Sequence, residues 1–210
     1  MHFGFLFLVK SDGENTVKHL QNSARVWEQI QTILFLGAVC GGLACGYYFL
    51  GDLENARKHA ERAIQIDAAA GITLLLSLPH IALCMIHLDS GDLKTARSHA
   101  EQALNLALKN GEKQLESRAR MLLGRLMAKE DISQSAKARE HIGEAIKALE
   151  ERKVLPYSSV GYLYLGELYA DMGQREKALE ILKKAESAFR KMGMEYHLLR
   201  TQKLLERLQS

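Results

Sequence analysis

Four histidines recur at one position of a repeating pattern, and imidazole is a common metal ligand in proteins. His19, His59, His99 and His141 follow one another at intervals of 40, 40 and 42 residues. Neighbouring helices lie roughly 8–10 Å apart, whereas a zinc-bound nitrogen lies about 2 Å from the ion. Successive histidines could therefore barely share an ion, and no carboxylate or cysteine joins them. We interpret them as inherited repeat residues and expect no metal site.

The three cysteines, Cys40, Cys45 and Cys84, all lie in apolar stretches. An odd number of cysteines without metal-like spacing indicates reduced, buried thiols and a cytoplasmic protein. Cys40 and Cys45 are five residues apart and would lie on different faces of a helix. We therefore interpret them as core residues.

Catalytic motifs are missing from this sequence. It has no phosphate-binding glycine loop, no G-x-S-x-G, no H-E-x-x-H and no convincing strand. The formal charge is only +3, and Lys and Arg alternate with Glu instead of forming a basic stripe. The acid pair Glu150-Glu151 lies beside Arg152 and Lys153, which is typical of a solvated helix surface. We expect no enzymatic activity, no cofactor and no nucleic-acid partner.

These residues are set in an internal repeat. The stretch Gly51–Ala63 returns as Gly91–Ala103, and one small residue marks each copy: Thr16, Ala56, Ala96, Ala138 and Ala178. Small or apolar residues follow each alanine at the fourth and seventh positions, which would let another helix approach one face closely. A period of this length predicts stacked helical units instead of one globular core.

A second signature lies about twelve residues before most of these alanines. It is clearest in the last copy, which reads Tyr162, Leu165, Gly166 and Tyr169, then Ala178 and Leu182. This resembles the W-x-x-L-G-x-x-Y … A-x-x-x-F pattern of tetratricopeptide repeats (TPR), with Tyr for Trp and Leu for Phe. The period is about 40 instead of 34, and no repeat ends in the usual proline. The resemblance implies an all-α superhelix, a solenoid of antiparallel helix pairs.

We predict a single TPR-like array over residues 1–210. Its parts are a truncated first repeat at 1–30, repeats at 31–70, 71–111, 112–155 and 156–193, and a capping helix at 194–210. In this register Met1–Lys10 is the second half of a first helix. A secretory signal is the alternative, but the basic start and the small-residue cleavage site are missing. The chain is therefore expected to be the C-terminal piece of a longer array.

Half a helix cannot cover its own apolar side chains. We therefore expect Phe3, Phe5, Leu6 and Phe7 to be partly exposed. Exposed apolar patches of this kind usually meet a partner. This predicts a homodimer that forms through the N-terminal end.

The stretch Thr32–Gly51 suggests an alternative function. It has no charged residue over a length that could span a bilayer, and it carries Gly37-x-x-x-Gly41 and Gly42-x-x-x-Gly46. A membrane-anchored helical protein with a transmembrane segment at 32–51 is therefore the alternative. The repeat register favours a buried repeat helix, because Leu43, Ala44 and Tyr47 fall on its signature positions. We expect no membrane partner.

The resemblance also implies where a partner would bind. In TPR arrays the second, fifth, ninth and twelfth positions of each first helix look into a concave groove. The partner contacts expected on these positions are Tyr48, Ile81, Met85, Leu88, Arg118, Arg125 and Glu167. Apolar anchors along one face suit an amphipathic helix, so the expected partner is a protein or peptide. The alternative is that the lengthened helices fill the groove themselves.

The end of the chain suggests a biological context. Residues 185–198, together with the glycine-rich helix before Gly51, resemble the C-terminal TPR arrays of large bacterial signalling proteins. In those proteins the repeats follow an ATPase, a nucleotide cyclase or a DNA-binding module. The resemblance implies a non-catalytic scaffold in the cytoplasm that regulates an upstream module.

Overall fold

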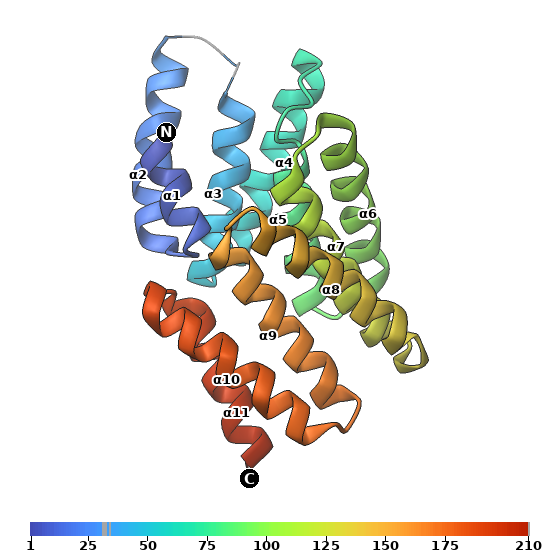
Figure 1. Ribbon diagram of the computed structural model, residues 1–210. Helices are drawn as coiled ribbons and strands as arrows, with labels where there is room; N and C mark the ends of the chain where they lie inside the picture. The colour runs from blue at the N-terminus through green and yellow to red at the C-terminus, as the bar shows by residue number, and fades with distance from the viewer. Residues whose placement is uncertain (31–32, 34, 210) are drawn as a thin grey trace. The chain divides into compact units, whose positions relative to one another are not determined.

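The computed structural model describes residues 1–30, 33 and 35–209, and these residues form helices without any strand (Figure 1). The helices are α1 (His2–Val9), α2 (Gly13–Gln29), α3 (Leu36–Leu50), α4 (Leu53–Ala70), α5 (Ser77–Asp89), α6 (Leu93–Asn110), α7 (Lys113–Glu130), the short 3₁₀ helix η1 (Ile132–Gln134), α8 (Ser135–Glu151), α9 (Leu155–Asp171), α10 (Arg175–Met192) and α11 (Glu195–Gln209).

The chain divides into two compact units, residues 1–116 and 117–210. In the first unit α1 packs on α2, α3 on α4 and α5 on α6. In the second unit α8 and α10 both pack on α9, and α11 packs on α10. Consecutive helices thus pack as pairs within the predicted repeats at 1–30, 31–70 and 71–111. The exact repeat boundaries remain a prediction, and positions 31, 32, 34 and 210 lie outside the described residues.

A glycine–aspartate pair turns the chain between the helices of the second repeat. Gly51 ends α3 with a φ of +79°, a left-handed conformation that glycine adopts without steric cost. The Asp52 carboxylate then accepts the backbone N–H of Asn55 at 3.1 Å and caps α4. Asp92 caps α6 in the same way, accepting the N–H of Thr95 at 3.1 Å. The repeated Gly-Asp sequence therefore encodes a repeated turn.

Paired helices approach each other at glycines that have no room for a side chain. A Cβ atom at Gly124 of α7 would lie 2.8 Å from both the Ala138 carbonyl oxygen and Ile142 Cγ1 of α8. A Cβ atom at Gly166 of α9 would lie 2.6 Å from Leu182 of α10. The repeat alanines Ala56, Ala96, Ala138 and Ala178 are all completely buried. Small side chains therefore set the distance between the helices of a pair.

The apolar stretch before Gly51 forms part of a repeat. Its described part is α3, a helix of 15 residues in which Leu43 and Ala44 are buried. None of the helices in the described part of the chain combines the length and the apolar character needed to span a bilayer. Thr32 and Leu34, at the start of the predicted membrane segment, lie outside the described residues.

The glycine contacts predict how the fold responds to one added methyl group. Gly124→Ala should lower the free energy of unfolding by about 1–3 kcal/mol, because the new Cβ overlaps a backbone oxygen that cannot move easily. The control is Gly143→Ala in α8, where a Cβ would meet no atom within 4 Å. This control should gain about 0.5–1 kcal/mol, since alanine favours helix over glycine. Urea unfolding measures the free energy of unfolding of both variants. Equal changes in Gly124→Ala and Gly143→Ala would contradict the close contact of α7 with α8 at Gly124.

Candidate functional site

The repeat histidines have a packing role in this structure. Three of their rings stack on the ring twelve residues earlier: Phe7 on His19, Tyr47 on His59 and His87 on His99, with centroid distances of 5.2, 5.2 and 5.8 Å. Across the described residues, no group of three or more His, Cys, Asp or Glu side chains could hold a metal ion. The repeat period thus places aromatic pairs between the two helices of a repeat.

One of these histidines also meets a histidine that the repeat pattern did not single out. The Nδ1 atoms of His80 on α5 and His99 on α6 lie 3.0 Å apart, so that one donates and the other accepts a hydrogen bond. His80 is buried, and this burial, with a smaller effect of His99, lowers the pKa of His80 from 6.5 to about 4. The hydrogen bond requires that at least one of the two rings is neutral, and burial favours the neutral form of His80.

Four large apolar side chains of α1 and of the end of α2 are exposed in the first unit. Phe3 and Leu6 of α1 are 67% and 62% exposed, and Val26 and Ile30 near the end of α2 are 53% and 58% exposed. We call these four side chains the α1–α2 face. The expected partial exposure is found at all four positions, since Phe3 and Leu6 are exposed and Phe5 and Phe7 are half-buried. Exposed apolar side chains that form one contiguous patch are typical of a surface that meets another molecule.

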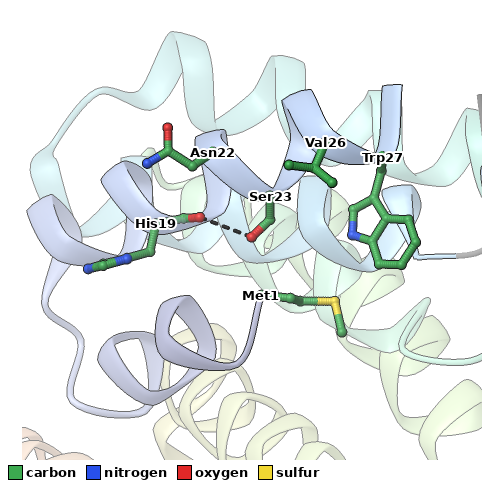
Figure 2. A pocket seen from close by; sticks show the side chains of 6 residues that line it. All are labelled: Met1, His19, Asn22, Ser23, Val26 and Trp27. Atoms are coloured by element: carbon green, nitrogen blue, oxygen red, sulfur yellow. Dashed lines mark hydrogen bonds between the residues drawn. The ribbon is translucent and has the colours of Figure 1, made fainter. Parts of the chain in front are cut away.

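A hollow of about 320 Å³ adjoins this face (Figure 2). Val26 and Trp27 line it at one end, the Met1 side chain lies across from them, and His19 and Asn22 line the rest with Ser23. The Ser23 hydroxyl donates to the His19 carbonyl oxygen at 3.0 Å, so its proton is used within α2. The hollow can therefore receive an apolar side chain more readily than a polar one.

The four apolar partner contacts predicted from the sequence are buried. At most 5% of the surface of Tyr48, Ile81, Met85 and Leu88 is exposed. The Tyr48 hydroxyl also donates to the Asp89 carboxylate at 2.5 Å. A partner would reach little of this row as the structure stands.

Of the three charged contacts, Arg125 and Glu167 come together in the second unit. Arg125 Nε lies 2.9 Å from Glu167 Oε2, and its guanidinium lies 4.5 Å from the centre of the Tyr164 ring. Arg200 of α11 donates to the other carboxylate oxygen of Glu167 at 2.7 Å. The Arg118 guanidinium lies 4.9 Å from the centre of the Tyr157 ring. We call Arg118, Arg125, Glu167 and Arg200 the arginine–glutamate cluster.

The cluster has a positive electrostatic field. Burial would raise the pKa of Glu167, but Arg125 and Arg200 outweigh burial and hold this pKa below its ordinary value. The pKa of the neighbouring His197 falls to about 3, because the ring is buried and because Arg200 and Arg118 repel a further positive charge. Glu167 is therefore ionised and His197 neutral at pH 7.

Sequence reasoning missed Arg200 as a member of this cluster. It lies in the capping helix, outside the repeat pattern, and the signal available was only its place on the polar face of α11. Its side chain is 26% exposed and that of Glu167 17% exposed, so both can still be reached from solvent.

Known families match this chain in three segments. Tetratricopeptide repeat profiles match residues 38–69, 77–102 and 161–191. No curated protein sequence matches the chain.

Several solved structures share the fold. A Rap protein complexed with competence and sporulation factor has a TM-score of 0.75 at 15% identity, over 98% of this chain and 62% of that one. Aspartyl phosphate phosphatase F from Bacillus subtilis has a TM-score of 0.62 at 19% identity, over 98% and 56%. BtubC (BKLC) from P. vanneervenii has a TM-score of 0.58 at 14% identity, over 95% and 89%.

These likenesses confirm the predicted fold class, an all-α array of tetratricopeptide type. At such low identity they concern the fold alone. The chain spans about three fifths of the length of the first two structures.

Acid should destabilise the protein through His80. In the unfolded chain this ring takes up a proton below about pH 6.5, whereas the folded chain resists protonation down to about pH 4. The stability that the neutral His80 ring contributes to the free energy of unfolding is therefore complete above pH 6.5. It is lost as the pH falls toward 4, and about 2 kcal/mol of it is lost between pH 7 and 5. His80→Asn keeps a hydrogen-bonding atom near Nδ1 but cannot titrate. Urea unfolding at pH 7 and pH 5 measures how far the free energy of unfolding falls. The fall should be about 2 kcal/mol smaller in His80→Asn than in the wild type, and equal falls would show that His80 does not cause the acid sensitivity.

Burial of the predicted apolar row can be tested with one charge. Met85→Glu should lower the free energy of unfolding by roughly 3 kcal/mol or more, because the carboxylate enters a site that is 5% exposed. Leu108→Glu on α6, where the leucine is 45% exposed, is the control and should change stability by about 0.5 kcal/mol or less. A Met85→Glu variant that melts like the wild type would show that this row opens to solvent.

Proposed function

We propose, from the premise that the chain belongs to the tetratricopeptide repeat family, that it is a non-catalytic protein-interaction module. The observation that carries this proposal is the α1–α2 face, with four large apolar side chains that are each more than half exposed. A Rap protein with the same fold was solved in complex with competence and sporulation factor, which supports a binding role for this architecture.

Self-association through the α1–α2 face is the first part of this proposal. A second copy of the chain brings the same apolar surface, so that contact between identical faces buries both at once. Such an isologous contact is self-complementary and closes at two subunits. The adjoining hollow at Trp27 offers space for an apolar side chain of the second copy.

Binding of a protein or peptide at the predicted groove positions is the second part. The arginine–glutamate cluster is the more accessible half, because Arg200 and Glu167 keep part of their surface in solvent. A guanidinium has five N–H donors, so Arg200 can donate to a partner carboxylate while it retains its bond to Glu167. This favours a partner with an acidic side chain. An amphipathic helix with acidic residues would satisfy the requirement.

We infer that this binding regulates an upstream module within a larger signalling protein. We also infer that the protein acts in the cytoplasm. The sequence resemblance to the repeat arrays of bacterial signalling proteins supports this role. The burial of all three cysteines is compatible with reduced thiols in a reducing compartment.

The self-association test changes the α1–α2 face without removing α1. Deleting α1 would uncover Leu20, which is completely buried, so substitution is the cleaner test. Phe3→Ser/Leu6→Ser should convert a dimer into a monomer, because each monomer loses two apolar contacts of the shared surface. Light scattering after size-exclusion chromatography, over a range of protein concentrations, measures the mass.

The matched control replaces two exposed leucines elsewhere in the same unit. Leu74 and Leu108 are 55% and 45% exposed, and Leu74→Ser/Leu108→Ser should keep the wild-type mass. A wild-type chain that stays monomeric at every concentration, or an unchanged mass for Phe3→Ser/Leu6→Ser, would remove the homodimer from the proposal.

A further inference from the structure

A second hollow of about 320 Å³ lies within residues 117–210, between α9 and α10. We call it the α9–α10 pocket. One wall consists of Leu155, Ser158, Ser159 and Tyr162, which share one face of α9. The other wall consists of α10 side chains from Lys184 to Met192, and Glu150 at the end of α8 closes one side. It shares no lining residue with the arginine–glutamate cluster.

The interior of the pocket is suited to hydrocarbon. Leu155, Ala188 and Met192 contribute apolar surface, and Leu155 is 57% exposed. Ser158 and Ser159 also line the pocket, but both hydroxyls donate to the Leu155 carbonyl oxygen, at 3.1 and 2.8 Å. Their protons are therefore used within α9, and the apolar side chains determine what this part of the pocket can hold.

Two ammonium groups belong to the α10 wall. Lys184 and Lys191 are seven residues apart, which places them on one face of the helix at a separation of about 10 Å along its axis. The Lys184 Nζ atom lies 3.7 Å from the centre of the Tyr162 ring. The Tyr162 hydroxyl donates to Glu150 Oε1 at 2.7 Å, so the single carboxylate of the pocket is engaged with the phenol. Positive charge thus exceeds negative charge in the lining.

Apolar walls and a cationic wall together select one chemical class of ligand. We propose that the α9–α10 pocket binds an apolar organic acid, with its carboxylate at Lys184 and Lys191 and its hydrocarbon part against Leu155, Ala188 and Met192. The volume has room for about ten water-sized groups. A straight-chain acid such as octanoate, with about ten non-hydrogen atoms, has this size.

Calorimetric titration of the full chain with octanoate, octylamine and octanol tests the proposal. The three probes share the hydrocarbon chain and differ in charge. Octanoate should bind at least about tenfold more tightly than octylamine, because like charges repel at the lysines. Octanol should lie between them. Equal binding of octanoate and octylamine, or no binding of octanoate, would overturn the proposal.

Substitutions in α10 test where octanoate binds. Lys184→Gln and Lys191→Gln should each weaken octanoate binding about two- to fivefold, as expected for solvated ion pairs. Lys183→Gln is the matched control, since Lys183 is exposed on the same helix and does not line the pocket. Unchanged affinity in the double variant Lys184→Gln/Lys191→Gln would show that octanoate binds elsewhere.

A blocking variant gives an independent result. Ala188→Trp fills the pocket and should abolish octanoate binding, whereas Ser187→Trp, on the exposed side of α10, should leave it intact. Melting temperatures show whether both variants fold. Full affinity in a folded Ala188→Trp protein would overturn the proposal.

The same chemistry could come from a free metabolite or from a protein segment. The peptide acetyl-Leu-Glu-Leu-amide carries an acid between apolar groups and serves as the second probe. Octanoate binding without peptide binding assigns the pocket to a free acid. Competition of the peptide with octanoate assigns it to an acidic segment of a protein.

Discussion

The close approach of two helices at a small side chain is the contact on which both units depend. At Gly4 of α1, as at Gly124 and Gly166, an added Cβ would overlap the partner helix, at 2.5 Å from Leu20 in the first case. Such a contact brings the two helices near enough for many weak dispersion contacts along their length. The stacked Phe7–His19 pair and the completely buried Ala138 and Ala178 lie on these same helix pairs. A larger residue at the contact would separate them and loosen the rest.

Most of the fold could be predicted because these contacts recur at a fixed spacing in the sequence. Ala56 and Gly166 predict helix pairs for a direct physical reason, since only a small residue allows this packing. The contacts made outside the repeat could not be predicted. Arg200 reaches Glu167 from the capping helix, and the Glu112 carboxylate accepts the N–H of Leu75 at 2.6 Å across 37 residues. Side-chain contacts of this kind depend on the final course of a turn or a terminal helix.

The candidate site was harder to predict than the fold. The register of the first predicted repeat indicated exposed Phe3 and Leu6, and both side chains are exposed in the structure. It also placed Met85 and Arg125 on equivalent helix positions, although Met85 is buried with apolar neighbours and Arg125 is ion-paired. A helical wheel gives the direction of a side chain but not what the next element places in front of it. Burial in a repeat protein therefore depends on neighbours that the pattern of one repeat does not specify.

The short helix η1 has a consequence for how such chains evolve. Gly4 meets a residue 16 positions later, as Gly166 does, whereas Gly124 meets Ile142, which lies 18 positions later. The two extra residues fall in the connection that contains η1, and the contact re-forms beyond them. Repeat length can thus drift by insertion at the turns while selection acts on the contact itself. Divergent copies can in this way keep one architecture after their sequences no longer align at a constant period.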